Sequence, residues 1–124
     1  MGKKKIMIVD DEPGVLYTIK HGLESLDAGY EVIPVESGKQ CLEMLEQDTI
    51  PDLIILDIMM PEMNGWEVHK KLKNQVQWRT IPVIFLTAAT DTTSKRIGSI
   101  IGDDYIQKPF DVPDLKKRIE KVLK

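Results

Sequence analysis

Aspartates follow two apolar runs of the sequence, at positions where carboxylates could bind a cation. Asp57 closes the run Leu53–Leu56, and Asp10 and Asp11 follow the run Ile6–Val9. Unbroken apolar runs are typical of strands that are buried on both faces of a parallel sheet. In open α/β sheets, ligands bind beyond the carboxyl ends of the strands. The three carboxylates are therefore expected to lie together at one rim of the molecule.

Two other polar residues end later runs. Thr87 follows Val83–Leu86, and Lys108 follows Tyr105–Gln107 and precedes Pro109. Two carboxylates about 4 Å apart repel by roughly 4 kcal/mol at an effective dielectric near 20, so the acids need a cation or a proton. Hard oxygen ligands suit Mg²⁺, which takes part of its shell from phosphate oxygens.

This set of side chains could transfer a phosphoryl group. A carboxylate such as Asp57 can act as a nucleophile and form an aspartyl phosphate. Phosphoryl transfer needs in-line positioning and neutralised charge, which a cation would supply on one side and Lys108 on the other. Thr87 could donate a hydrogen bond to a phosphoryl oxygen. Taken one at a time, each residue is also explained as an ordinary strand-end or surface side chain.

The elements that position these residues alternate along the chain. Strands are expected at about 4–10, 31–35, 52–57, 82–87 and 104–108. Helices are expected between them, at about 14–27, from Ser37 with Gln40 completing a capping box, from Asn64, and from Asp111. Five β-α pairs predict a doubly wound, flavodoxin-like α/β sandwich. Pro34 favours an edge position for the second strand, which the order 2-1-3-4-5 provides.

Several residues are interpreted as structural. The segment between Thr87 and the last strand is the least regular helix, since it holds three β-branched threonines and a glycine. His21 and His69 are expected to be exposed on helices, and Cys41 to lie in the core. Lys116–Arg118 is interpreted as a solvated helix face, with a docking role left open. Trp66 and Trp78 could anchor a partner, but partial burial explains them as well.

Composition restricts the classes of protein. The chain has 124 residues, the size of one domain, and 1–124 is expected to be that single domain. A net charge of −3 argues against direct nucleic-acid binding. One cysteine allows no internal disulfide and fits a reducing, cytoplasmic compartment. No apolar stretch approaches the roughly 20 residues that span a bilayer, so no membrane role is expected.

The chain resembles a response-regulator receiver domain, CheY-like, of two-component phosphorelay signalling over essentially its whole length. The resemblance rests on Val9–Glu12, Asp57–Gly65, Thr87-Ala88 and Asp103–Phe110, in that order. It implies a phosphoprotein switch that catalyses only its own phosphoryl transfer and dephosphorylation. The implied donor is a sensor histidine kinase or a phosphotransfer protein, and the implied recipient of the signal is a downstream protein target. A monomer, or a weak dimer that depends on phosphorylation, is expected.

The resemblance also implies roles for individual residues. Asp57 is implied to be the phosphoacceptor, and Lys108 and Thr87 to contact the phosphoryl group, with Lys108-Pro109 cis. Mg²⁺, or Mn²⁺, is implied to bind Asp11, Asp57 and the backbone carbonyl of Met59, and Asp10 through water. Thr87 and Tyr105 are implied to form the switch that changes the surface of helix four, strand five and helix five.

Two departures from the family pattern bear on signalling. The segment from Thr87 to Lys108 is one position shorter than usual, which falls on the irregular fourth helix. Met59 and Ala89 are apolar at two positions that modulate hydrolysis in the family, so we expect a long-lived phosphoryl group.

Three alternative functions fit the sequence less well than the switch. One is a phosphorylation-independent interaction module on the same fold, against which the intact acids, threonine and lysine argue. A flavin-binding protein would need a hydroxyl- and glycine-rich loop after the first strand, where Asp10–Pro13 stands instead. A metal-dependent phosphohydrolase would need a substrate cap, for which the chain has no room.

Overall fold

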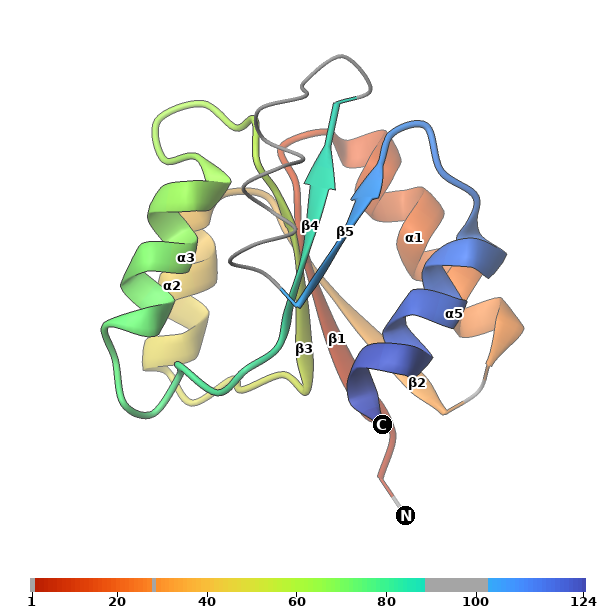
Figure 1. The fold of residues 1–124 in the computed structure, drawn as a ribbon, viewed down its shortest axis with the longest axis horizontal. Coiled ribbons are helices and arrows are strands. Elements are labelled where there is room, and N and C mark those ends of the chain that lie inside the picture. Colours follow the sequence, from red (N-terminus) through yellow and green to blue (C-terminus); the bar gives the residue numbers. More distant parts are fainter. Residues whose placement is uncertain (1, 28, 89–102) are drawn as a thin grey trace.

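The described part of the chain, residues 2–27, 29–88 and 103–124 of the computed structural model, is an α/β sandwich (Figure 1). Five parallel strands form one sheet of order β2-β1-β3-β4-β5. The predicted doubly wound fold and its strand order are confirmed. The strands are β1 (Lys4–Val9), β2 (Tyr30–Val35), β3 (Leu53–Asp57), β4 (Val83–Thr87) and β5 (Asp104–Gln107).

Four helices of the described part cover the two faces of the sheet. α1 (Pro13–Leu26) and α5 (Val112–Leu123) lie on one face, and α2 (Gly38–Glu46) and α3 (Gly65–Lys73) on the other (Figure 1). None of these helices is long and apolar enough to cross a membrane. The predicted fourth helix, with Thr90, Thr92, Thr93 and Gly98, lies outside the described residues.

The central strands are apolar throughout because both of their faces are buried. Every residue of β3 and of β4 is buried. Successive side chains of a strand point to opposite faces. Met7, Val9, Ile54 and Leu56 therefore pack under α2 and α3, while the residues that alternate with them, Ile6, Ile8, Leu53 and Ile55, pack under α1 and α5.

Side-chain caps fix where three of the helices begin. Asn64 and Glu67 form a complete capping box at α3, with two hydrogen bonds of 3.0 Å. Ser37 accepts from the Gln40 N–H at α2, but the Gln40 side chain accepts from the Glu36 N–H instead of that of Ser37. The reciprocal box predicted at α2 is therefore only half formed. At α5, Asp111 accepts from the Asp114 N–H at 2.7 Å.

A Schellman motif ends α2. The Thr49 N–H donates to the Met44 carbonyl, and the Asp48 N–H donates to that of Leu45, both at 3.0 Å. Asp48 adopts the left-handed conformation at φ 66° that this motif requires. The chain then enters β3, so this turn helps to set the direction of the strand that carries Asp57.

The prediction that His69 is exposed is wrong. Its side chain is buried, with its ring centroid 5.3 Å from that of Phe85 on β4. Among the described residues its Nε2 has no hydrogen-bond partner. The reason is that α3 buries a wide face, which includes Val68 and Leu72 as well as His69. His21 is exposed on α1, and Cys41 is in the core, as predicted.

The stretch Lys116–Arg118 is also less solvated than predicted. Only Lys117 is exposed. Lys116 lies 3.0 Å from Glu120, and Arg118 lies 3.1 Å from Asp104 on β5. The two flanking cations therefore form ion pairs, because helix geometry turns them toward acids of the same helix or of the neighbouring strand.

Candidate phosphoryl-transfer site

Three carboxylates lie together at the rim of the sheet. Asp10 follows β1 directly, Asp57 is the last residue of β3, and the two strands are paired through Val9 and Leu56. One oxygen from each of Asp10, Asp11 and Asp57 lies within 4.8 Å of the others. The strand order produces this cluster, since it makes β1 and β3 neighbours at the centre of the sheet.

The three acids differ in their surroundings. Asp10 is completely buried, and its Oδ1 accepts a hydrogen bond of 2.8 Å from the Glu12 N–H. Asp57 is 3% exposed, whereas Asp11 faces solvent. A cation at this rim would thus meet two fixed, buried carboxylates and a third on the open side.

Lys108 reaches into the acid cluster from the end of β5. Its Nζ lies 3.0 Å from Asp10 Oδ2, 3.6 Å from Asp57 Oδ1 and 3.2 Å from Glu12 Oε1. The Lys108-Pro109 peptide bond is cis, and the Lys108 N–H donates to the Thr87 carbonyl at 2.8 Å. The contact with Glu12 was missed at the sequence level, although the run Asp10–Glu12 offered a third acid as a signal.

Burial and like charge raise the proton affinity of the cluster. Burial, followed by the charge of Asp10, raises the pKa of Asp57 to about 7, although Lys108 and the Met59 backbone act in the opposite direction. Burial likewise raises the pKa of Asp10, in spite of its contact with Lys108. Burial alone would lower the pKa of Lys108, but its contacts with Asp10 and Asp57 outweigh that effect and raise it.

These shifts indicate that the site is short of positive charge. Two unit charges 4.8 Å apart repel by about 3 kcal/mol at an effective dielectric near 20. One ammonium group serves three acidic side chains here. A divalent cation, for which carboxylate oxygens are suitable ligands, fits the donor set and would remove the repulsion.

Thr87 and Tyr105 lie on adjacent strands beside the cluster. Thr87 ends β4 and is buried, and its hydroxyl donates to the Ala88 carbonyl at 3.4 Å. Tyr105 is half-buried on β5 and is paired with Phe85, two residues before Thr87. The structure therefore places the two predicted switch residues on neighbouring strands that both end at the rim.

The loop after Asp57 is held closely against β3. The Gly65 N–H donates to the Ile58 carbonyl at 2.9 Å. A Cβ added at Gly65 would lie only 2.5 Å from the Asp57 carbonyl oxygen. Within the loop, Glu62 adopts a positive φ of 68°, and the Met59 side chain is 63% exposed. Gly65 is thus required for the close approach of α3 to the end of β3.

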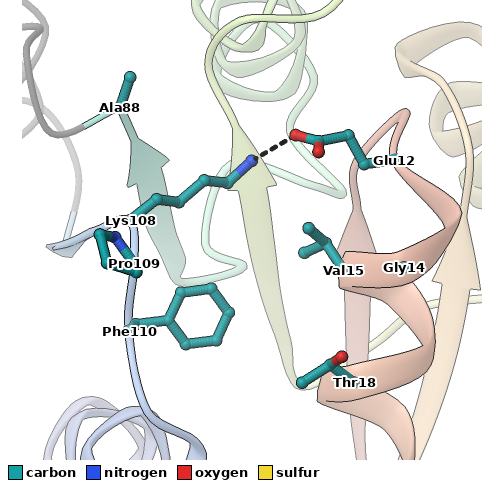
Figure 2. Close-up of a pocket in the computed structure, with 8 residues that line it drawn as sticks. All are labelled: Glu12, Gly14, Val15, Thr18, Ala88, Lys108, Pro109 and Phe110. Carbon is teal, nitrogen blue, oxygen red and sulfur yellow. Dashed lines mark hydrogen bonds and ion pairs between the residues drawn. The ribbon is translucent and has the colours of Figure 1, made fainter.

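A hollow of about 660 Å³ opens next to Lys108 (Figure 2). Phe110 and the residues before it form one side, and the first turns of α1 form the other. Lys108 and Glu12 meet across it, so the hollow lies beside this ion pair, and none of the three aspartates lines it. It is lined by Glu12, Gly14, Val15, Thr18, Ala88, Lys108, Pro109 and Phe110.

Comparison with known proteins identifies a family and several relatives of this chain. The family described as response regulator receiver domain matches residues 6–120. The alkaline phosphatase synthesis transcriptional regulatory protein PhoP of Bacillus subtilis is 37% identical over 98% of this chain and 49% of its own length. The chain spans about half the length of the curated relatives PhoP and ycf27 of Porphyridium aerugineum.

Solved structures show the same fold. The Vibrio cholerae chemotaxis protein CheY4 superimposes with a TM-score of 0.85 at 31% identity, covering 98% of this chain and 99% of that one. The receiver domain of a signal transduction histidine kinase from Syntrophus aciditrophicus gives a TM-score of 0.85 at 38% identity, covering 97% and 89%. The chain therefore belongs to the response regulator receiver domain family of two-component signalling proteins.

Proposed function

We propose that Asp57 accepts a phosphoryl group from the phosphohistidine of a sensor histidine kinase or phosphotransfer protein. The main support is the arrangement of charged groups around Asp57. One oxygen from each of Asp10 and Asp11 lies within 4.8 Å of an Asp57 oxygen. The Lys108 ammonium lies 3.6 Å from Asp57 Oδ1. An Asp57 oxygen forms the new bond to phosphorus, and the bond from phosphorus to the histidine nitrogen breaks, with its electron pair leaving on the nitrogen.

Mg²⁺, or Mn²⁺, would be held by Asp11, Asp57 and the Met59 carbonyl, and by Asp10 through water. When bound, the cation neutralises the charge of the phosphoryl oxygens. Lys108 stabilises that charge from the other side, and its fixed contact with Asp10 aims its ammonium at Asp57. The Thr87 hydroxyl would exchange its long contact with the Ala88 carbonyl for a phosphoryl oxygen.

Movement of Thr87 would carry the signal to Tyr105 and so to a downstream protein target. The signal is a shift in the population of two conformers of the surface formed by β5 and α5 together with the predicted fourth helix. We propose that the chain works in the cytoplasm as a monomer or a weak phosphorylation-dependent dimer. It catalyses no reaction beyond its own phosphoryl transfer and dephosphorylation.

The phosphoryl group is proposed to be long-lived. The Met59 side chain is exposed beside the site and offers no polar atom that could orient an attacking water. Ala89, the second apolar position on which this expectation rests, lies outside the described residues. A half-life of seconds after removal of the donor would contradict the proposal.

The function is tested by incubating the protein with Mg²⁺ and acetyl phosphate and measuring its intact mass. Wild type is expected to gain one phosphoryl group, and the gain should disappear with a chelator. Asp57→Asn should gain none, whereas Asp48→Asn, a matched change at an exposed turn, should label as wild type does. Unchanged labelling of Asp57→Asn would overturn the proposal.

A further inference from the structure

Met59 carries the most exposed sulfur in the part of the chain that the structure describes. Its side chain is 63% exposed. Met7 and Met60 are buried, at 0% and 8%, and Met44 and Met63 are half-buried. A peroxide in solution must reach the sulfur of a thioether in order to oxidise it, so Met59 should react before these other methionines.

The thiol of Cys41 does not compete for such an oxidant. Cys41 is completely buried in the core, and its Sγ lies 3.8 Å from Met7 Sδ. Burial raises the pKa of this thiol to about 12, so the reactive thiolate is almost absent at neutral pH. Mild oxidation of the folded protein should therefore spare the core sulfurs and act at the surface.

The backbone on both sides of Met59 fixes its position in the loop after β3. The Met60 N–H donates to the Ile58 carbonyl at 3.2 Å, which closes a three-residue turn with Met59 at its centre. The same carbonyl accepts from the Gly65 N–H at 2.9 Å. Ile58 and Met60 are both buried, so the turn is anchored in the core and presents Met59 to solvent.

This turn lies against the proposed phosphoacceptor. Met59 follows Asp57 by two positions, and contact with the Met59 backbone is one of the influences that lower the pKa of Asp57. The thioether sulfur is only a weak hydrogen-bond acceptor, whereas a sulfoxide makes the side chain polar. Oxidation would thus place an accepting oxygen where an apolar side chain now lies beside the phosphoryl site.

We propose that Met59 is a redox modification site through which a hydroperoxide shortens the lifetime of the phosphoryl group on Asp57. The inference rests on the proposed function, in which Asp57 carries that group. In the oxidation step the O–O bond of hydrogen peroxide breaks, one oxygen forms a bond to the Met59 sulfur, and the other leaves as water. The sulfur is oxidised by two electrons, and the peroxide is reduced by two.

The sulfoxide oxygen then accepts a hydrogen bond from the water that attacks phosphorus. The water oxygen forms the new bond to phosphorus, the bond from phosphorus to the Asp57 oxygen breaks, and its electron pair stays on the carboxylate. The protons of the water leave on the released phosphate. A single hydrogen bond that forms in the transition state changes a rate by about threefold to tenfold.

The proposal is tested on wild type, Met59→Leu and Met63→Leu, each before and after mild treatment with hydrogen peroxide. Peptide mass spectrometry measures the fraction of sulfoxide at every methionine, and circular dichroism checks the fold. Each sample is phosphorylated with acetyl phosphate at saturating Mg²⁺, the donor is removed, and loss of the phosphoryl group is followed by intact mass. Each protein is compared with itself, which cancels any effect of leucine on the untreated rate.

Met59 should be oxidised before the other described methionines. Peroxide should then speed loss of the phosphoryl group from wild type by about threefold to tenfold, and from Met63→Leu by the same factor. Met59→Leu should show no response to peroxide, although its remaining methionines are those of wild type. Methionine sulfoxide reductases restore the thioether and should return oxidised wild type to its untreated rate.

Several results would overturn the inference while leaving the proposed function intact. They are oxidation of Met63 or of a buried methionine ahead of Met59, a rise below about threefold once Met59 is oxidised, an equal rise in Met59→Leu, or loss of phosphorylation in the oxidised protein alone. An untreated wild type that takes up no phosphoryl group would overturn the proposed function, and this inference with it.

Discussion

Gly65→Ala should damage the phosphoryl-transfer site without changing any group that takes part in the chemistry. The new Cβ would lie 2.5 Å from the Asp57 carbonyl oxygen and 2.8 Å from the Ile58 Cα, and both are backbone atoms. The shorter distance falls about 0.9 Å short of the 3.4 Å at which ordinary contacts begin. Either α3 or the end of β3 must move by a comparable amount.

A displacement of that size is large on the scale of catalysis. Misplacement of a reacting group by about 1 Å can cost roughly 100-fold in rate. We therefore expect the rate of phosphorylation by acetyl phosphate to fall by about 10-fold to 100-fold. The overpacked contact should also lower the free energy of unfolding by about 1–3 kcal/mol.

The assay is the initial rate of phosphorylation at saturating Mg²⁺, together with urea unfolding. Gly14→Ala is the matched control, since a Cβ at Gly14 in α1 meets no atom within 4 Å. Alanine is the better helix former by up to about 1 kcal/mol, so this control should be slightly more stable and react at the wild-type rate. A folded Gly65→Ala whose rate stays within about threefold of wild type would refute the positional argument.

Three other substitutions test the electrostatics and the turns. The hydrogen bond from the Val32 N–H lowers the pKa of Glu24 below its ordinary 4.5. The ionised Glu24 therefore stabilises the folded state above pH 4.5, and this stabilisation is lost as the pH falls through the lowered pKa. Glu24→Gln should therefore flatten acid unfolding curves below about pH 5; identical slopes in wild type and variant would be inconsistent with this. Burial, and after it the charge of Lys73, lowers the pKa of His69 below 6.5. The unfolded state therefore binds a proton more readily than the folded state, and the free energy of unfolding decreases as the pH falls from 6.5 through the lowered pKa. His69→Phe should lose less stability than wild type between pH 7 and pH 5 in urea titrations, and an equal loss would show that His69 is not the group responsible. Asp48→Gly should raise the unfolding free energy by up to about 1 kcal/mol because glycine adopts φ 66° without strain, and a lower melting temperature would contradict this.

The positions of the rim residues could be predicted because each one ends an apolar run. Burial on both faces removes polar residues from β3 and β4, so the first polar side chain marks the carboxyl end of the strand. Pro34 favours an edge position for β2, which agrees with the order 2-1-3-4-5, but that order was taken in part from the resemblance to receiver domains. The order brings Asp10 and Asp57 together.

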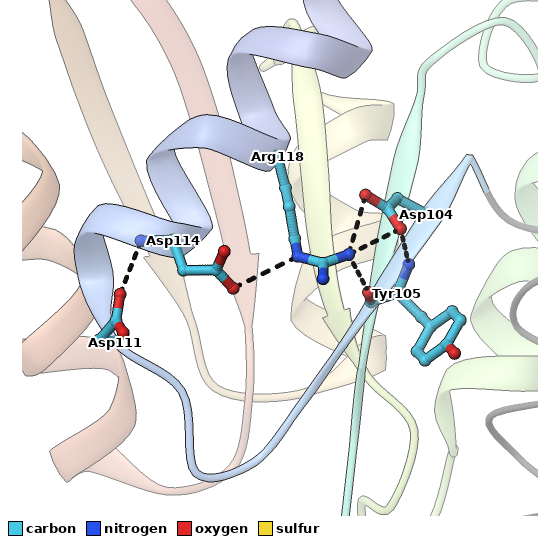
Figure 3. Close-up of polar contacts among 5 residues, drawn as sticks. All are labelled: Asp104, Tyr105, Asp111, Asp114 and Arg118. Carbon is cyan, nitrogen blue, oxygen red and sulfur yellow. Dashed lines mark hydrogen bonds and ion pairs between the residues drawn. The ribbon is translucent and has the colours of Figure 1, made fainter.

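Contacts between distant side chains could not be predicted in this way. The burial of His69 depends on how α3 lies over β4, and the Glu12–Lys108 pair depends on where the last loop returns to the rim. The hydrogen bond from Arg118 to the Tyr105 carbonyl (Figure 3) depends on both the twist of the sheet and the position of α5. A sequence interpreted element by element gives the direction of a side chain on its own helix, but not the partner that lies opposite.

The proposed function requires Asp57 to carry the phosphoryl group, and borohydride trapping identifies the modified residue directly. The protein is phosphorylated with acetyl phosphate and Mg²⁺, the acyl phosphate is reduced, and the modified residue is located by peptide mass spectrometry. The predicted result is a single modified residue at Asp57, absent without Mg²⁺. Modification at Asp10, Asp11 or any other acid in place of Asp57 would contradict the account.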